Sequence, residues 1–317
     1  MSLGATLESG PVMDDTALRK QQVIDFLTGF SVETTPGAAA KTPDYRDHLR
    51  QGAVVAVTFL PGSDFADTIA TAKRLKDEGF EPAPHFAARS IPSRGALEDY
   101  LKRLQGEVGV TQVVALGGAV SHPLGPFESS MSMLETGLFD RYGIETIGVA
   151  GHPEGSPDIS EKGLAAALEW KNAFAERSGA ALYIATQFCF EAAPIIAWEQ
   201  RLRAAGITLP LYIGLPGLAT LRSLIGHART CGVGPSVSFL KRQARSVARL
   251  LTVSAPDELV GALADYRASD PDCAIAGVHV YPLGGLKKSA RWCYAAANGQ
   301  LTLNPLGNGF QVHVELD

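Results

Sequence analysis

The fold is decided by residues 54–88, which read VVAVTFLPGSDFADTIATAKRLKDEGFEPAPHFAA. An apolar, β-branched run opens this segment, and a second short apolar run closes it. Between the two runs, from Asp64 to Phe80, apolar residues recur at three- and four-residue spacing, the period of an amphipathic helix. A strand, a helix and a second strand form the repeating unit of parallel α/β proteins. Residues 54–88 therefore predict one such unit.

The same alternation continues on both sides of this segment. The expected strands are Phe30–Thr35, Val54–Leu60, Pro82–Ala88, Gln112–Gly117, Glu145–Ala150, Ala181–Phe190, Leu209–Leu215 and Ala274–Tyr281. The expected helices cover residues 64–80, 93–109, 128–143, 160–179, 191–206 and 217–232. This number of parallel strands with short connections favours a (β/α)₈ TIM barrel. The alternative is an open Rossmann-like sheet, but its glycine fingerprint does not follow the first strand, where the sequence reads Glu-Thr-Thr-Pro-Gly.

The ends of the expected helices carry boundary signals. Most helices close on a glycine, which tolerates the positive φ of a helix C-cap. These glycines are Gly79, Gly109, Gly143, Gly179, Gly206 and Gly232. Asp64, Ser93 and Ser160 are suited to cap the N-termini of three helices.

We expect a single catalytic domain, the barrel, over residues 30–300. An N-terminal arm would precede it at residues 1–29, with a polar start over residues 1–20, and a C-terminal tail would follow at residues 301–317. The tail alternates like a solitary edge strand or an extended segment. Residues 235–270 predict one or two additional helices before the last strand.

The composition excludes several classes of partner. The net charge is −5 and the isoelectric point is about 5.8, so no broad basic surface is available for nucleic acid. The N-terminus lacks the basic start and apolar run of a signal peptide, and no apolar stretch is long enough for a membrane span. We therefore expect a cytoplasmic protein with a small-molecule substrate and no membrane partner. The sequence leaves homo-oligomer formation open.

Metal-binding motifs are also missing from the sequence. The four cysteines form no CxxC pair, and no HExxH motif is present. The segment His152-Pro153-Glu154 is restricted by its proline and is a poor chelating pair. We expect no metal.

Glu33 is the first candidate for catalysis, because the active site of such a barrel forms where the strands end. A carboxylate next to the apolar residues of a strand is costly to bury, and desolvation would raise its pKa towards the range useful to a general acid. The alternative is a structural Glu33 that faces solvent or pairs with a lysine.

Further candidates follow the other strands. Gln187 offers a neutral amide to a pterin or nicotinamide edge, or is a satisfied core residue. His85 could bond a cofactor or a neighbouring strand. Gly117 and Gly118 could bring backbone N–H groups close to a cofactor, or form an ordinary turn. Tyr281 ends the last strand as a candidate substrate contact.

Five segments, taken in order, resemble the catalytic barrel of the methylenetetrahydrofolate reductase family. They are Ser31–Pro36 (SVETTP), Ala83–Phe86 (APHF), His152–Glu154 (HPE), Leu168–Lys171 (LEWK) and Ala185–Glu191 (ATQFCFE). The similarity extends over roughly residues 30–284, and the order of the set makes it more specific than any one motif.

This resemblance implies an enzyme that reduces 5,10-methylenetetrahydrofolate to 5-methyltetrahydrofolate in one-carbon metabolism and methionine biosynthesis. It implies that Glu33 protonates a folate nitrogen and opens the methylene bridge, which gives an iminium that accepts hydride. The hydride would pass from NAD(P)H to FAD and then to folate. Gln187, Phe188 and Phe190 would bind folate or nicotinamide. The residues expected to line the FAD site are Thr58, His85, His152 and Lys171; without the resemblance, Lys171 would be a solvated helix lysine.

The sequence departs from the family at two strand ends. Leu116-Gly117-Gly118-Ala119 stands where the family has Leu-Arg-Gly-Asp, so an arginine for the FAD phosphate and an aspartate for the pterin are missing. The last strand lacks the family's Asn-Arg. Candidates to replace the positive charge are Lys287, Lys288 and Arg291, and candidates to replace the pterin partner are His122, Glu128 and Glu154.

These departures leave alternatives open. FAD could bind through altered contacts, or flavin could be absent and NAD(P)H could deliver hydride directly to folate. The same site could run in reverse as a 5-methyltetrahydrofolate oxidase in a demethylation pathway. A binding barrel without turnover, holding folate or flavin, is a third alternative, against which the presence of Glu33 argues.

Overall fold

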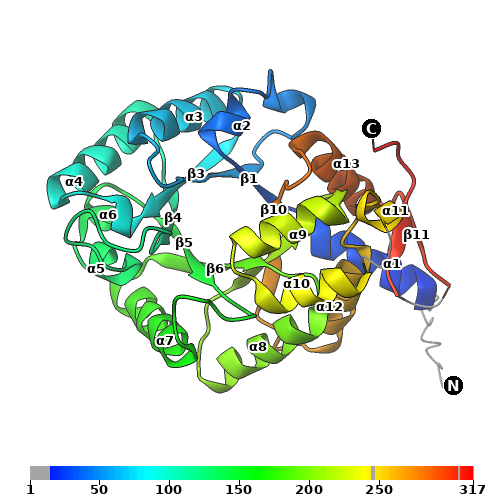
Figure 1. The fold of residues 1–317 in the computed structure, drawn as a ribbon. Coiled ribbons are helices and arrows are strands. Elements are labelled where there is room, and N and C mark those ends of the chain that lie inside the picture. Colours follow the sequence, from blue (N-terminus) through cyan, green and yellow to red (C-terminus); the bar gives the residue numbers. More distant parts are fainter. Residues whose placement is uncertain (1–14, 244–246, 306–307, 317) are drawn as a thin grey trace, which may run out of the picture.

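A closed barrel of eight parallel strands forms the centre of the molecule (Figure 1). The computed structural model describes residues 15–243, 247–305 and 308–316. The strands follow one another around the barrel in the order β1-β10-β7-β6-β5-β4-β3-β2. They are β1 (Ser31–Thr34), β2 (Val54–Val57), β3 (Glu81–Ala87), β4 (Gln112–Leu116), β5 (Thr146–Gly151), β6 (Ala181–Phe188), β7 (Leu211–Pro216) and β10 (Ile275–Tyr281). The expected strands and the expected TIM barrel are both confirmed.

Helices surround this barrel and connect successive strands, as Figure 1 shows. The connecting helices are α2 (Pro36–Ala39), α3 (Phe65–Asp77), α4 (Arg94–Arg103), α5 (Ser130–Leu134), α6 (Leu138–Arg141), α7 (Glu161–Ser178) and α8 (Ala192–Ala204). Three short turns complete these connections: the 3₁₀ turns η1 (Tyr45–Asp47) and η2 (Ala88–Ser90), and the π-helical turn η3 (Leu104–Val108). Helix α13 (Leu286–Ala297) follows the last barrel strand.

The glycines and N-cap residues predicted to end and begin helices lie at helix ends in the structure. All six glycines predicted to close helices have positive φ, between 68° at Gly143 and 92° at Gly79. The side chains of Asp64, Ser93 and Ser160 accept hydrogen bonds from backbone N–H groups in the first turns of α3, α4 and α7. One expected helix is wrong in extent. Residues 128–143 form the separate helices α5 and α6, because Gly137 between them has a φ of 68°.

Two tyrosines fill space inside the barrel. The rings of Tyr183 on β6 and Tyr212 on β7 meet edge to face, with centroids 5.1 Å apart. Glycines on the neighbouring strands make room for them, since a Cβ on Gly148 would lie 2.6 Å from Tyr183 and one on Gly277 would lie 3.1 Å from Tyr212. These strand glycines permit close packing rather than a turn.

The connection from β7 to β10 is the longest part of the fold beyond the barrel strands. It contains β8 (Ala219–Thr220), α9 (Leu221–Thr230), α10 (Gly234–Gln243), α11 (Val247–Leu250), β9 (Val253–Ser254) and α12 (Asp257–Ser269). The described residues between 235 and 270 belong to three helices, α10, α11 and α12, so the expectation of one or two helices was wrong. Strands β8 and β9 pair antiparallel and tie the two ends of the α9–α11 segment together.

The two ends of the described chain pack beside each other outside the barrel (Figure 1). Helix α1 (Asp15–Leu27) contacts α12 and α13, and Arg19 forms a 2.7 Å ion pair with Asp265. The C-terminal residues form an antiparallel hairpin of β11 (Leu301–Leu303) and β12 (Phe310–Val312), not the expected solitary strand. Phe310 stacks on Trp292 and anchors this hairpin to α13. Among the described residues, no helix is long and apolar enough to cross a bilayer.

Candidate functional site

Glu33 lies at the carboxyl end of β1, between the neighbouring strands β2 and β10. In the barrel register Glu33 is opposite Ala56 of β2, and Ser31 is opposite His279 of β10. The first and last barrel strands are adjacent only because the barrel closes, so residues almost 250 positions apart in the sequence meet here. Barrel closure therefore places Glu33 and His279 on one edge of the site.

The Glu33 carboxylate is enclosed by hydrogen-bonding side chains. The hydroxyl of Thr58 donates to its Oε1 atom. His85 Nε2 lies 4.0 Å from Oε1, and His279 Nε2 lies 3.9 Å from Oε2. Only 13% of the Glu33 side chain is exposed. The strand-end position predicted for Glu33 is correct, and its structural alternative of facing solvent or pairing with a lysine does not occur.

The pKa of Glu33 shifts in the direction opposite to the one expected from burial. Desolvation raises this pKa, but the interactions with His279, His85 and Thr58 together outweigh it and hold the pKa below the ordinary value of 4.5. Glu33 is therefore a carboxylate near neutral pH. The expectation of a raised pKa considered burial alone and was wrong in this state.

The two histidines differ in their surroundings. Burial lowers the pKa of His85, which keeps its imidazole neutral near pH 7, although Glu33 acts in the other direction. His279 is fixed from its far side, because Nδ1 lies 2.8 Å from Ser31 Oγ. Its ring also meets the Tyr281 ring edge to face at 5.0 Å. The sequence shows His279 at a strand end but not its approach to Glu33.

The predicted aromatic walls lie beside the α9–α10 segment. Phe188 is 1% exposed and packs edge to face against both Phe190 and Tyr281. All three belong to a small apolar cluster with residues of α9 and α10. The Tyr281 hydroxyl donates to the Thr186 carbonyl at 2.9 Å. These rings support the segment over the barrel, and the ring of Phe188 is fully used in that packing.

Gln187 and the Gly117–Gly118 pair form hydrogen bonds with nearby backbone groups. The Gln187 side-chain oxygen accepts a 3.0 Å hydrogen bond from the Phe188 N–H. Gly118 has a φ of 90°, and a Cβ there would lie 3.2 Å from the Ala87 side chain. The Gly117 carbonyl accepts a hydrogen bond from the Arg89 N–H. The glycine pair therefore forms a tight turn against the end of β3.

Lys171 is buried, although a lysine on an outer helix is usually exposed to solvent. It lies on α7 but is only 6% exposed, so the solvated-lysine alternative is wrong. Burial lowers the pKa of Lys171 to about 8. The pKa of nearby His152 is lowered by its own burial and then by the Lys171 ammonium group. No carboxylate within the described ranges pairs with Lys171. A buried cation beside a histidine is suited to an anionic group of a ligand.

Arg89 is a basic residue near β4 that sequence reasoning missed. It follows β3, and its guanidinium donates to the carbonyls of Glu128 at 2.9 Å and Val120 at 3.4 Å. These bonds fix the loop after β4, in which the family's arginine and aspartate are absent. Arg291 and His122 do not join any of these groups; both are exposed.

Glu154 has a structural partner, although the sequence suggested it as a replacement for the pterin ligand. Its carboxylate accepts hydrogen bonds from the backbone N–H and the hydroxyl of Ser236, at 3.0 Å and 2.8 Å. Ser236 lies in the first turn of α10 and is fully buried. Glu154 therefore caps α10 from the loop after β5.

A cavity of about 530 Å³ lies beside α10 and the start of α12. Phe190, Phe239 and Arg242 contribute to its wall, and Glu33 does not. Within the described part of the chain, no three His, Cys, Asp or Glu side chains gather closely enough to hold a metal ion.

The fold and the site together define a class of (β/α)₈-barrel protein with a carboxylate held between histidines at its strand ends. The sequence matches the family described as Methylenetetrahydrofolate reductase over residues 44–245, more than half of the chain. The chain therefore belongs to the methylenetetrahydrofolate reductase family.

Two curated relatives match parts of the chain. Methylenetetrahydrofolate reductase 2 of Saccharomyces cerevisiae is 25% identical over 171 residues, 51% of this chain and 27% of the yeast protein. Methylenetetrahydrofolate reductase 1 of Schizosaccharomyces pombe is 37% identical over 90 residues, 27% of this chain and 14% of that protein. The matched segments thus span less than a third of either relative.

Two solved structures resemble the fold at low identity. An uncharacterized protein from Clostridium thermocellum that binds two copies of 5-methyl-5,6,7,8-tetrahydrofolic acid gives a TM-score of 0.49 at 11% identity, covering 88% of this chain and 97% of that chain. A structure from Aquifex aeolicus VF5 gives 0.43 at 12% identity, covering 90% and 98%. At these TM-scores neither likeness bears on function.

Proposed function

We propose that this protein interconverts 5,10-methylene- and 5-methyltetrahydrofolate, with NAD(P)H as the hydride donor in the reducing direction. Family membership supports the substrate class and the reaction type. The observation that carries the proposal is the Glu33 carboxylate, nearly enclosed at the end of β1 between His85 and His279. A carboxylate in such a position can exchange a proton with a bound ligand while bulk water is largely excluded.

In the reducing direction Glu33 acts as the general acid. Opening the methylene bridge needs a proton on the folate nitrogen that leaves, and Glu33 supplies it. Because the carboxyl pKa is low without ligand, Glu33 must gain its proton when folate binds. An apolar pterin ring that displaces water increases desolvation, which raises the carboxyl pKa in the required direction. Thr58 orients the Glu33 carboxyl group, and Ser31 orients the ring of the neighbouring His279.

The oxidising direction is a second candidate, and the state of Glu33 favours it. Closing the methylene bridge releases a proton from the folate nitrogen, and a carboxylate can accept it directly. In the ligand-free site Glu33 already has this form, with Thr58 donating to it and two histidines facing its oxygens. A 5-methyltetrahydrofolate oxidase would therefore use the site without a prior protonation step.

The residues fit a phosphate-bearing cofactor on one side of the barrel. Lys171 is a buried ammonium group with no carboxylate partner among the residues that the structure describes, and His152 lies near it. These two residues would hold a phosphate of FAD or of a nicotinamide nucleotide. Thr58 and His85, which the family resemblance assigned to the FAD site, lie next to Glu33. When bound, FAD supplies a relay for hydride, and without it NAD(P)H would have to reach folate directly.

The direct test is an assay of purified protein with both folates and both nicotinamides. Methylenetetrahydrofolate is supplied with NADH or NADPH, and 5-methyltetrahydrofolate with NAD⁺ or NADP⁺, each with and without FAD. We expect turnover with at least one nicotinamide, and weak retention of FAD on gel filtration because the family's arginine is absent. No turnover of either folate by folded protein would refute the proposed function. A stoichiometric flavin absorption band after purification would contradict the weak retention.

A further inference from the structure

Residues 217–256, which connect β7 to α12, combine a high positive charge with a complete lack of acidic residues. The stretch contains six basic residues, Arg222, Arg229, Lys241, Arg242, Arg245 and Arg249, and no aspartate or glutamate. The whole chain has 28 basic and 33 acidic residues, so the other parts hold 22 basic and 33 acidic ones, a net charge of −11. This connection is therefore a cationic segment of an otherwise acidic protein.

The basic side chains that the structure describes in this connection face solvent. Arg222 and Arg229 lie on α9, Lys241 and Arg242 lie on α10, and all four are exposed. Arg242 lies 3.7 Å from the Glu191 carboxylate. Arg222, Arg229 and Lys241 form no ion pair with a carboxylate in the described ranges. Neighbouring carboxylates therefore do not neutralise these three charges.

Helices α9 and α10 lie over the carboxyl ends of barrel strands, and Figure 1 shows them across one side of the barrel opening. Apolar residues of both helices pack in one cluster with Phe188 of β6 and Tyr281 of β10. The Tyr281 ring meets the ring of His279, whose Nε2 atom lies 3.9 Å from Glu33. The basic segment thus borders the part of the opening that contains Glu33.

The C-terminal end of α9 comes near Glu33 itself. Partial burial raises the pKa of the thiol of Cys231, the C-cap of α9, and the Glu33 carboxylate raises it further. These two groups therefore lie within electrostatic reach of each other. The next residue, Gly232, packs against Pro157 of the loop after β5, where a Cβ would lie 2.6 Å from the proline ring. Arg229 is thus held on a helix end that is fixed at the rim of the site.

The ligands of the proposed reaction are all anions. Folate carries two carboxylates on its glutamate, a nicotinamide dinucleotide carries a diphosphate, and NADPH carries one phosphate more. The acidic remainder of the protein repels such ligands, whereas cations at the rim of a cleft attract them and can raise association rates about tenfold or more. Such a field acts over about one Debye length, so cations at the opening act on a ligand before it makes any contact.

We propose that the basic surface of α9 and α10, formed by Arg222, Arg229 and Lys241, steers the anionic ligands of the reaction into the barrel opening and speeds their association. The inference rests on the proposed function, which supplies the ligands. The long-range attraction increases with the charge of the ligand, so the association of NADPH gains more from this surface than that of NADH.

Two other roles of exposed cations predict different results. Cations that contact the bound ligand slow its dissociation, whereas cations that act during approach change mainly the association rate and its dependence on salt. Cations that act only through the net charge of the protein have the same effect wherever they are placed. Rate constants measured for variants of equal net charge therefore separate the three roles.

The test measures association and dissociation rate constants by stopped-flow fluorescence for NADH, NADPH and monoglutamyl 5-methyltetrahydrofolate. The proteins are the wild type, the variant Arg222→Gln/Arg229→Gln/Lys241→Gln, and the control Lys73→Gln/Lys102→Gln/Arg201→Gln. The control residues are exposed in the C-terminal halves of α3, α4 and α8, which return to the opposite end of the barrel. Both variants lose the same charge.

At an ionic strength of about 0.01 M, the α9–α10 variant should bind its ligands more slowly, on the order of tenfold, with the larger decrease for NADPH. At about 1 M, where the Debye length is about 3 Å, its association rates should equal those of the wild type. Dissociation rates should change little, and the control should associate like the wild type at both ionic strengths.

Equal association rates of the wild type and the α9–α10 variant at low ionic strength would overturn the inference. An equal decrease in the control would also overturn it, because net charge alone would then explain the effect. A decrease that persists at high ionic strength, together with faster dissociation, would replace steering with direct contact. These three results leave the folate function intact. Absence of folate and nicotinamide binding by folded wild type would instead refute the proposed function and the inference that rests on it.

Discussion

Glu33 owes its chemical state to its neighbours rather than to burial. A mostly enclosed carboxylate normally has a raised pKa, but the two histidines and Thr58 reverse this direction. With a folded-state pKa below the ordinary 4.5, Glu33 stabilises the folded protein above that pH. This contribution is lost as the pH falls through the folded-state pKa. The low pKa of Glu33 suits a proton acceptor, and the proposed role as an acid requires this pKa to rise when the substrate binds.

His279→Gln should raise the pKa of Glu33. The substitution removes the hydrogen bond and the charge that His279 offers to the carboxylate, while desolvation remains. We expect a higher pKa, which ¹³C NMR titration of the side-chain carboxyl would measure, with Glu33→Gln to assign the signal. His122→Gln, in an exposed loop, is the control and should leave the titration unchanged. A Glu33 pKa that does not move in His279→Gln would show that the histidine does not set it.

The α9–α10 segment contacts the loop after β5 and an apolar cluster that includes barrel residues. Glu154 caps α10 through Ser236, and Pro157 of the same loop packs against Gly232, where a Cβ would lie 2.6 Å from its ring. Phe188 and Tyr281, from barrel strands, contribute to the apolar cluster beneath the segment. The segment therefore depends on the loop after β5 for its position.

Ser236→Ala should loosen α10 and leave the barrel intact. The change removes the hydroxyl bond to Glu154 in a fully buried place, with an expected loss of about 1 kcal/mol. Hydrogen exchange should become faster in α10 and stay unchanged in strands β2 to β5. Ser238→Ala, at an exposed position of the same helix, is the matched control. Equal protection of α10 in both variants would contradict the capping role of Glu154.

Elements that depend on local sequence could be predicted, and those that depend on contacts between distant segments could not. Strand periodicity and the glycine caps are local, so the eight barrel strands and helix ends such as Gly79 were correct. The break at Gly137 was missed because the apolar spacing continues across it. Lys171 was missed as a buried residue because its depth depends on how α7 packs against the barrel, not on its own helix.

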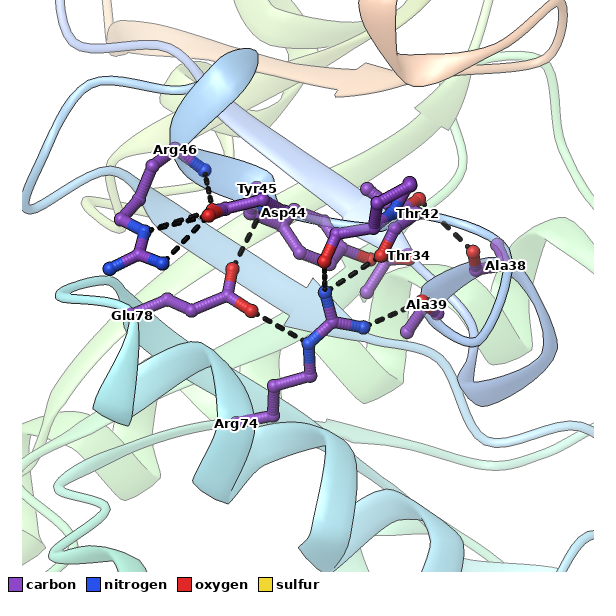
Figure 2. Close-up of polar contacts among 10 residues, drawn as sticks. Thr34, Ala38, Ala39, Thr42, Asp44, Tyr45, Arg46, Arg74 and Glu78 are labelled. Atoms are coloured by element: carbon purple, nitrogen blue, oxygen red, sulfur yellow. Dashed lines mark hydrogen bonds and ion pairs between the residues drawn. The ribbon is translucent and has the colours of Figure 1, made fainter.

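The residues of the site can be divided in the same way into those that could be predicted from the sequence and those that could not. Glu33 could be predicted from a carboxylate at a strand end, and the family from the order of five short motifs. The approach of His279 to Glu33 appears only when the last strand pairs with the first. The hydrogen bonds from the Arg74 guanidinium to the carbonyls of Ala39 and Thr42, which fix the loop after β1, join residues more than thirty positions apart and leave no sequence signal (Figure 2). The residues that line the cavity of about 300 Å³ beside β1 and β10 likewise come from distant parts of the sequence.

The barrel as a whole brings Glu33 of β1, His85 of β3 and His279 of β10 together near the ends of their strands. If this arrangement serves folate chemistry, the reaction must depend on the Glu33 proton and not merely on binding. Substrate affinity and turnover should then respond differently to the loss of that proton.

The measurement that tests this most directly is turnover and folate affinity of Glu33→Gln in the same preparation. The amide keeps the shape of the side chain and cannot exchange a proton, so turnover in either direction should fall on the order of 10²-fold or more. Folate binding should survive, and Glu145→Gln, at an exposed residue just before β5, should behave like the wild type. Wild-type turnover in Glu33→Gln would contradict the assignment of Glu33 as the catalytic residue.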